Sequence, residues 1–88
     1  MKTEFKKSFL KDVKALREAG LKERIKDVIA WVETADALQG VSGVKKLTGS
    51  DRYYRIRVGD YRIGLIIEGE TVTFVRCLHR REIYRYIP

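Results

Sequence analysis

Three arginines stand close together in the second half of the chain, as Arg55, Arg57 and Arg62. Successive side chains of a β-strand alternate between its two faces, so Arg55 and Arg57 share one face. Gly59-Asp60 suits a two-residue hairpin loop, and that loop pairs Arg57 with Arg62 on the next strand. Like charges at directly opposite positions destabilise a sheet by up to about 1 kcal/mol. A fold that keeps such a pair is expected to hold an anion between the arginines.

The same hairpin register pairs Arg55 with Gly64, which has no side chain. The missing side chain leaves room for a shallow pocket beside the arginines. On the opposite face the register brings apolar residues together throughout, as expected for the side that meets a core. One structural interpretation stays open, in which the arginines extend into water or pair with Asp51 and Glu82.

The end of the chain, residues 78–88, interleaves arginine and tyrosine. That mixture is expected where phosphates are bound and bases are stacked. Arg80 and Tyr84 are the candidates for the same site, whereas Tyr86 is expected to pack back on the sheet edge. His79 is a candidate general acid or base because a histidine imidazole titrates near neutrality. It stands without the cysteines or carboxylates that a metal site or a catalytic triad needs.

The chain carries a net charge of +7, and this charge is unevenly distributed. Residues 1–43 have nine basic and seven acidic side chains, whereas residues 44–88 have ten and five. The second half is rich in arginine, whose planar guanidinium suits bidentate phosphate contacts. These features predict an anionic partner for the second half, with nucleic acid as the first candidate. The alternative is a basic surface that only contacts water.

Other catalytic signatures are missing from the sequence, which has no Gly-rich phosphate loop, nucleophile elbow or recognisable pair of carboxylates. The single cysteine, Cys77, excludes an internal disulfide and a thiolate metal site. We therefore expect no metal and no cofactor. An enzyme made from these residues must work with cations, which fits RNA cleavage by attack of the 2′-oxygen on phosphorus. The general base is unassigned, since arginine is a poor base.

A predicted helix precedes the sheet that must carry these residues. Apolar side chains recur at helical spacing from Phe9 to Leu16. Ser8 is the candidate cap of this helix, and Gly20 is its expected end. A short first strand is expected before it, at residues 4–6.

A second helix is expected at about residues 21–38, and its apolar stripe comprises Leu21, Ile25, Val28, Ile29 and Val32. The break at Gly20 is short, so the two helices should form an antiparallel hairpin. Trp31 stands beside the stripe, where packing is the simpler interpretation.

Beyond residue 43 the apolar pattern becomes that of strands, at about residues 44–47, 53–58, 61–67 and 71–78. The second tight turn is expected at residues 68–70. The predicted fold class is α+β, with an N-terminal helical hairpin packed on a twisted antiparallel β-sheet as a single domain over residues 1–88. No apolar run approaches the about 20 residues that cross a bilayer. No signal peptide is recognisable either, so we expect a cytoplasmic protein and no membrane partner.

At these residues the sequence resembles the RelE/ParE toxin superfamily. The resemblance spans essentially the whole chain. It rests on the helical hairpin and on four short motifs that come after it: Lys46-Leu47-Thr48-Gly49, Tyr54-Arg55-Ile56-Arg57-Val58, Gly59-Asp60-Tyr61-Arg62 and His79-Arg80-Arg81-Glu82-Ile83-Tyr84-Arg85. Each motif is short, and their order and spacing together carry the resemblance. The fold that it implies is RelE-like.

The resemblance to RelE-type ribonucleases implies a role for each of five residues. Arg57 and Arg62 would bind the scissile phosphate, and Arg55 would stabilise charge and help to position the 2′-hydroxyl. Arg80 would assist the leaving group, while Tyr84 would stack on a base or orient it.

The chain departs from some relatives at two points. Those relatives have lysine at the positions of Arg55 and Arg57, where a lysine with a lowered pKa acts as the base. The spacing from Arg80 to Tyr84 is also tighter than in some members, so Arg81 competes for the role of Arg80. Further RNA contacts are expected from Lys45, Lys46, Arg52, Arg81 and Arg85.

The function implied by the resemblance is that of a toxin in a type II toxin-antitoxin system. It would be a ribosome-dependent endoribonuclease, an mRNA interferase that cleaves mRNA in the A site and so inhibits translation. Its partners would be mRNA, the 70S ribosome and a cognate antitoxin. Two alternatives stay open, a DNA gyrase inhibitor of the ParE kind and a catalytically silent module that binds RNA or a partner. The presence of all five candidate residues argues against the gyrase inhibitor.

Overall fold

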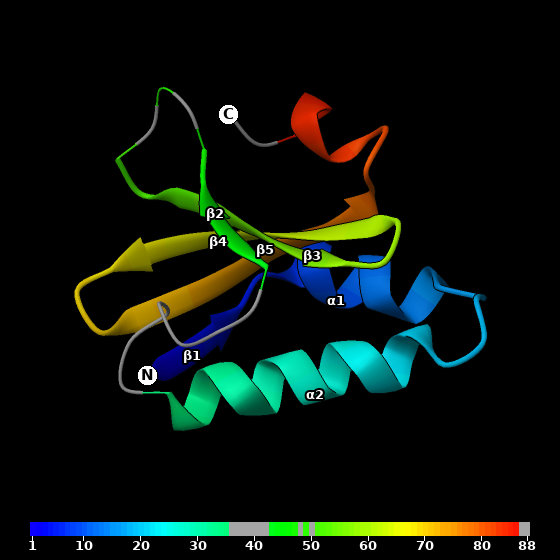
Figure 1. Cartoon of the computed structure of the whole chain (residues 1–88), viewed down its shortest axis with the longest axis horizontal. Helices are drawn as coiled ribbons and strands as arrows, with labels where there is room; N and C mark the ends of the chain where they lie inside the picture. The colour runs from blue at the N-terminus through cyan, green and yellow to red at the C-terminus, as the bar shows by residue number, and fades with distance from the viewer. Residues whose placement is uncertain (36–42, 48, 50, 87–88) are drawn as a thin grey trace.

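The structure, a computed structural model, describes residues 1–35, 43–47, 49 and 51–86. Its elements along the chain are β1 (Lys2–Phe5), α1 (Lys7–Ala15), α2 (Leu21–Thr34), β2 (Val44–Lys46), β3 (Tyr53–Val58), β4 (Tyr61–Glu68), β5 (Thr71–His79) and a short 3-10 helix, η2 (Ile83–Arg85). The strands form one sheet in the order β1-β5-β4-β3-β2. Both helices lie on one side of this sheet, and the C-terminal segment, residues 80–86, lies on the other (Figure 1).

The predicted α+β class with a helical hairpin is confirmed, with one correction to the sheet. β1 pairs in parallel with β5, from Lys2 opposite Thr71 to Phe5 opposite Phe74, so the sheet is mixed. The other strand pairs are antiparallel. Apolar alternation does not reveal the direction of an edge strand. Here the phenyl rings of Phe5 and Phe74 stack with centroids 5.1 Å apart, which attaches β1 to β5 at the point where the chain enters α1.

The core lies between the helices and the sheet. Its buried members are Phe9, Leu21, Ile25 and Val32 from the helices and Ile56, Val58, Ile63, Leu65, Val72, Phe74 and Cys77 from the strands. The predicted stripe of α2 is confirmed, since its other two members, Val28 and Ile29, also pack against this core. The packing expected for Trp31 is wrong, because its side chain is 48% exposed.

The expected helix ends need correction. α1 ends at Ala15, because the next residue, Leu16, is extended. Gly20, with a φ of +78°, precedes α2 rather than ending α1, and this left-handed conformation suits glycine. α2 ends at Thr34, because Ala35 is extended. The expected end near residue 38 is thus too late, and residues 36–38 lie outside the described part of the chain.

The predicted hairpin register of β3 and β4 is confirmed at every pair, from Val58 opposite Tyr61 to Tyr54 opposite Leu65. The turn glycine, Gly59, has a φ of +60°, as a tight hairpin loop requires. The second turn is one residue shorter than expected, since Glu68 pairs with Thr71.

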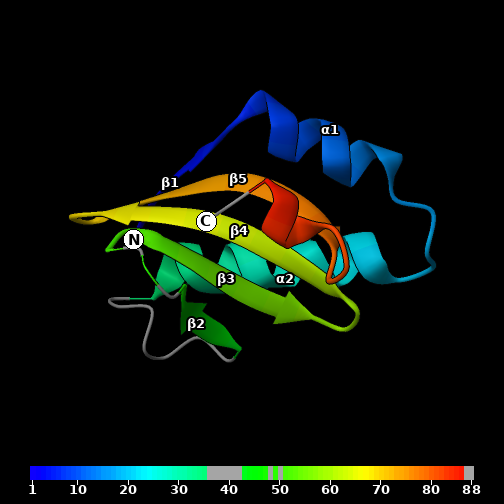
Figure 2. The ribbon, with the colours of Figure 1, turned by 90° about the horizontal axis from the view of Figure 1, so that it is seen from above.

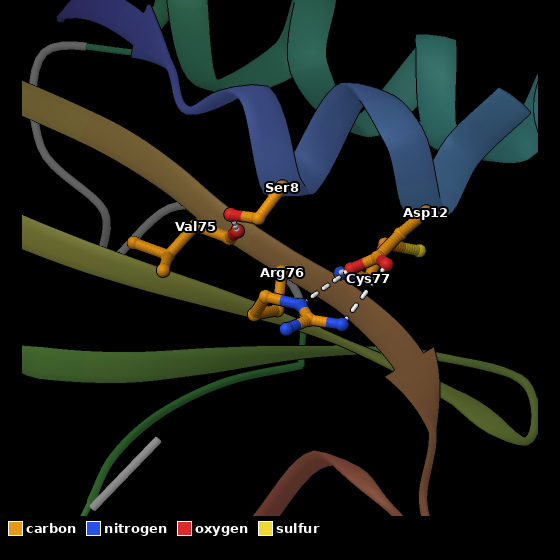
Figure 3. Close-up of polar contacts among 5 residues, drawn as sticks. All are labelled: Ser8, Asp12, Val75, Arg76 and Cys77. Carbon is orange, nitrogen blue, oxygen red and sulfur yellow. Dashed lines mark hydrogen bonds and ion pairs between the residues drawn. The ribbon is translucent and has the colours of Figure 1, made fainter. Parts of the chain in front are cut away.

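α1 protects the edge of β5 that β1 leaves uncovered. β1 pairs only as far as Phe74. Beyond it, the Ser8 hydroxyl donates to the Val75 carbonyl at 2.6 Å and the Asp12 carboxylate accepts from the Cys77 N–H at 2.9 Å (Figure 3). Ser8 therefore does not cap α1, whose N-cap is Lys6. Such contacts occupy backbone groups that would otherwise pair with another chain.

In the described part of the chain, no helix is long and apolar enough to cross a membrane.

Candidate functional site

The arginines of the β3–β4 hairpin lie on the face of the sheet opposite the helices. Ile56 and Val58 face the core, so strand alternation places Arg55 and Arg57 on the other face. Arg62 is the partner of Arg57 across the hairpin. The C-terminal segment crosses this same face, as the view from above shows (Figure 2). We call the face opposite the helices the open face. The open face and the C-terminal segment together form the candidate site.

The guanidinium of Arg62 is held by the hairpin turn. Its Nη1 donates to the Gly59 carbonyl at 2.8 Å and to the Tyr61 carbonyl at 2.9 Å. These bonds use one edge of the planar group and leave its other donors for a ligand. Arg55 is held more loosely, with Nη1 3.4 Å from the Gly43 carbonyl.

The pKa of Arg62 is sensitive to burial and to nearby charges. Desolvation is the first cause that lowers its pKa, and the positive charges of Arg55, Arg57 and Arg80 lower it further. The phenol of Tyr84 acts in the opposite direction and raises this pKa. Together with the pairing of Arg57 with Arg62, these effects place the five residues predicted for catalysis near one another. The mutual repulsion of the four arginines marks the place where a phosphate would be stabilised.

Two contacts place the C-terminal segment over the arginines. The Arg80 backbone N–H donates to the Asp60 carbonyl at 2.8 Å, which joins the segment to the hairpin turn. Three residues later, Ile83 is fully buried in a small second core on the open face. That second core also contains Leu47, Tyr53 and Leu78. Tyr84 follows directly and is 53% exposed, so its ring is available for stacking on a base.

His79 lies on the other face of the sheet from this cluster. It pairs with Tyr61, whose ring packs against the main core, and the two rings meet edge to face at 5.6 Å. Its Nδ1 accepts from the Arg81 backbone N–H at 3.2 Å. His79 also lines a cavity of about 410 Å³ beside the end of α1. The structure thus gives no geometric support for His79 as the general acid or base.

The five residues expected to make further RNA contacts do not form one surface. Lys45 pairs with Arg55 and shares its face, whereas Lys46 pairs with Tyr54 on the opposite face. Arg52 lies beyond the other end of β3, where its Nη1 is 3.6 Å from a carboxylate oxygen of Glu68.

Arg81 and Arg85 both belong to the exposed C-terminal segment. Of the five residues expected to make further RNA contacts, Lys45, Arg81 and Arg85 therefore adjoin the site. Lys46 and Arg52 lie away from it.

Sequence reasoning missed one ion pair, between Arg76 on β5 and Asp12 on α1. Nε of Arg76 is 2.7 Å from Oδ2 of Asp12, and Nη2 is 3.1 Å from Oδ1. Hydrogen bonding to Asp12 raises the pKa of Arg76. A signal was present, since Asp12 interrupts the apolar stripe of α1 three residues after Phe9. An acid at a core-facing position predicts a buried basic partner.

Among the described residues, no three histidine, cysteine or acidic side chains are placed to hold a metal ion together. Cys77 is a free, buried thiol. Desolvation, followed by the charge of Asp12, raises its pKa to about 12. Such a thiol is a poor nucleophile at neutral pH.

Comparison with known proteins gives a consistent result. A family model for the ParE toxin of type II toxin-antitoxin system, parDE, matches residues 3–84. The toxin RelE3 of Methanocaldococcus jannaschii is 43% identical over 89 residues, which cover all of both chains.

Solved structures agree with the sequence comparison. A RelB-RelE antitoxin-toxin complex from Methanococcus jannaschii matches with a TM-score of 0.82 and 41% identity, over 97% of this chain and 99% of that one. An archaeal RelE-RelB complex from Pyrococcus horikoshii OT3 shares the fold, with a TM-score of 0.72 and 22% identity over 90% and 93% of the two chains. The chain therefore belongs to the RelE/ParE superfamily of toxins of type II toxin-antitoxin systems.

Proposed function

We propose that this toxin is a ribosome-dependent endoribonuclease that cleaves mRNA in the ribosomal A site. The observation that carries the proposal is the pairing of Arg57 with Arg62 on the open face of the sheet, with Arg55, Arg80 and Tyr84 near enough for their charges to act on Arg62. A protein that only binds another protein has no need for four guanidinium groups at one place on an open sheet. The 43% identical relative is a toxin of the RelE kind, which supports the same reading.

The chemistry assigned to the site is charge stabilisation. When the 2′-oxygen attacks phosphorus, the phosphate gains negative charge, and fixed cations lower the energy of that state more than the energy of the substrate. We assign Arg57 and Arg62 to the phosphate and Arg55 to the side of the 2′-hydroxyl. We assign Arg80 to the leaving oxygen, which it assists, and Tyr84 to a base, on which it stacks or which it orients.

Positioning of the RNA is the second contribution. The turn carbonyls that hold Arg62 fix its guanidinium before substrate arrives, so little order must be created during the reaction. His79 lies on the opposite face of the sheet and does not supply the base. In this scheme the reaction depends on fixed cations and on an in-line substrate geometry imposed by the ribosome.

The proposed partners follow from the charge of the open face. mRNA and the 70S ribosome supply the phosphates, and the cytoplasm is where they occur. A cognate antitoxin would cover the arginines with an acidic segment that folds on binding. The related structure from Methanococcus jannaschii is a complex of an antitoxin with its toxin, which supports such a partner.

One experiment tests the proposal directly. Purified protein is incubated with programmed 70S ribosomes, and cuts in the mRNA are mapped by primer extension. We expect cleavage in the A-site codon and its loss in Arg62→Ala. The matched control is Arg17→Ala, which removes one exposed arginine from the helix side of the molecule. Intact mRNA after incubation with the wild-type protein would contradict the proposal.

A second candidate is inhibition of DNA gyrase, the activity that resemblance to the ParE branch implies, and the matching family model is that of the ParE toxin. It predicts intact mRNA together with a loss of supercoiling activity when the protein is added to gyrase and relaxed plasmid. If both mRNA and supercoiling are unaffected, the chain is a silent module that binds RNA or a partner. The same purified protein serves both assays.

A further inference from the structure

We propose that Arg76 is a positioning residue, which holds Tyr86 so that Tyr84 stays in place beside Arg62. The inference rests on the proposed ribonuclease activity and gives Arg76, Asp12 and Tyr86 a positioning role outside the site itself. The three residues come from β5, α1 and the C-terminal segment, and none of them belongs to the arginine cluster.

The guanidinium of Arg76 is fixed in place by Asp12. Two of its nitrogens donate to the two oxygens of one carboxylate, at 2.7 and 3.1 Å (Figure 3). The carboxylate is itself fixed, because it also accepts the Cys77 backbone N–H at 2.9 Å. The side chains of Arg76 and Asp12 are only 22% and 11% exposed. A planar group held in this way is a rigid platform rather than a mobile cation.

Tyr86 stacks on that platform. The central carbon of the Arg76 guanidinium lies 4.2 Å from the centroid of the Tyr86 ring, within the range of a cation–π contact. Tyr86 is nevertheless 56% exposed, so this contact is not part of a core. The stack therefore connects the end of the described chain to α1 through β5.

Tyr84 lies between two attachments of the segment. On one side, Ile83 is fully buried in the second core. On the other side, Tyr86 lies on Arg76. The intervening 3-10 turn spans only three residues, Ile83–Arg85, and so short a turn has little stability of its own. Loss of either attachment is expected to release the ring of Tyr84 from Arg62.

Arg76 is not a further phosphate ligand, and this separates it from the cluster. Its charge is neutralised by Asp12 at hydrogen-bond distance, whereas Arg62 is surrounded by other cations. Two of its nitrogens already donate to the carboxylate, and the Tyr86 ring lies over the guanidinium. Replacing Arg76 is therefore expected to change the rate of cleavage and to leave the binding of RNA largely unchanged.

The first test compares Tyr86→Leu with Tyr86→Phe on programmed ribosomes in single-turnover cleavage. The phenylalanine variant keeps the ring and is expected to cleave like wild type. The leucine variant loses the stack, and its cleavage rate is expected to fall about tenfold because a displaced group contributes less to the transition state. Its half-saturating ribosome concentration should change less than about twofold, as for a lost orientation rather than lost binding. Equal rates for the leucine variant and wild type would overturn the inference.

A double-mutant comparison asks whether Tyr86 acts through Tyr84. In a Tyr84→Ala background, Tyr86→Leu should have no further effect on the rate, because the group that it positions is gone. Arg76→Lys keeps the charge but loses the planar platform, so it should behave like Tyr86→Leu. Additive effects of Tyr84→Ala and Tyr86→Leu would contradict the inference.

A measurement without RNA separates this inference from the proposed function. NMR of the free protein reports the exchange of the Arg85 and Tyr86 amides, which bond to the carbonyls of Glu82 and Ile83 at 3.0 Å. Faster exchange is expected in Tyr86→Leu, and wild-type exchange in Tyr86→Phe. Unchanged exchange in the leucine variant overturns the attachment, whatever the cleavage assay shows. If wild type fails to cleave, the role in cleavage is overturned with the proposed function, and exchange still decides whether Arg76 holds the segment.

Discussion

Arg57 and Arg62 are directly opposite each other in the β3–β4 hairpin, and both side chains project from the open face of the sheet. The two guanidinium groups repel each other in the free protein, and this repulsion contributes to the lowered pKa of Arg62. Desolvation lowers that pKa most, because Arg62 is partly buried beside the turn. The hairpin thus keeps two like charges together at a position where most sheets have complementary partners. Such a pair becomes favourable once an anion lies between the two groups.

Replacing Arg57 is therefore expected to stabilise the free protein while it impairs the site. Arg57→Gln should raise the free energy of unfolding by a few tenths to about 1 kcal/mol, because it removes one of two opposed charges. Cleavage on programmed ribosomes should fall by about a hundredfold, as for loss of one preorganised group that stabilises charge. Urea unfolding and single-turnover cleavage measure the two quantities.

The control for this prediction is Arg17→Gln, at an exposed arginine on the helix side. Its effect on unfolding should stay within about 0.5 kcal/mol, as for other surface changes. The gain from Arg57→Gln should also shrink when salt is raised to 1 M, since exposed charges are then screened. A loss of stability in Arg57→Gln would mean that this arginine has a structural partner.

The sequence was sufficient to predict the hairpin because two independent patterns agree there. Alternation defines which residues share a face, and the Gly59-Asp60 turn defines the register. These two patterns predicted that Arg57 lies opposite Arg62 and that Arg55 lies opposite Gly64, and both pairings were confirmed. The features depend on residues close together in the chain, so one sequence is enough to predict them.

Features that depend on the packing of distant segments could not be predicted in this way. The parallel pairing of β1 with β5 joins residues about seventy positions apart, and nothing within Lys2–Phe5 specifies its partner. The face of His79 depended on the length of β5, which runs one residue beyond the expected end. The ion pair of Asp12 with Arg76 had only the misplaced acid in α1 as a signal.

His79 is expected to be dispensable for the chemical step. His79→Asn places an amide oxygen near the position of Nδ1, so the hydrogen bond from the Arg81 N–H is kept while the imidazole is lost. We expect cleavage within about threefold of wild type, whereas loss of a general acid or base lowers rates by about 10²–10⁴-fold. His79→Leu, which cannot accept the Arg81 N–H, serves as the comparison. A rate reduced by more than about a hundredfold in His79→Asn would restore His79 as an acid–base candidate.

The Asp12–Arg76 pair is expected to be important for folding as well as for the C-terminal segment. Asp12→Asn leaves an oxygen for the Cys77 N–H but leaves the largely buried Arg76 without a counter-charge. The free energy of unfolding should fall by up to about 3 kcal/mol, the loss expected when one partner of a buried pair is removed, because this pair is largely but not fully buried. Urea unfolding measures it, and Glu23→Gln, which breaks an exposed pair with Lys26, is the matched control. That control should lose less than about 1 kcal/mol.

Cys77 supplies a prediction about pH and reactivity. Its thiol is 1% exposed, and desolvation followed by the charge of Asp12 raises its pKa from 9.0 to about 12. The thiolate is the form that reacts with iodoacetamide, so the native protein should resist alkylation at pH 8 and the urea-unfolded protein should not. Rapid alkylation of the native protein would contradict this burial.

The same shift makes stability depend on pH in one direction. Between pH 9.0 and about 12 the unfolded thiol releases its proton while the folded thiol keeps it. The folded state therefore binds more protons, and its stability falls as pH rises through this window. Other groups titrate there too, so the measured quantity is the difference in unfolding free energy between wild type and Cys77→Ala. That difference should be constant below pH 8 and should change in favour of Cys77→Ala as pH rises above 9.0.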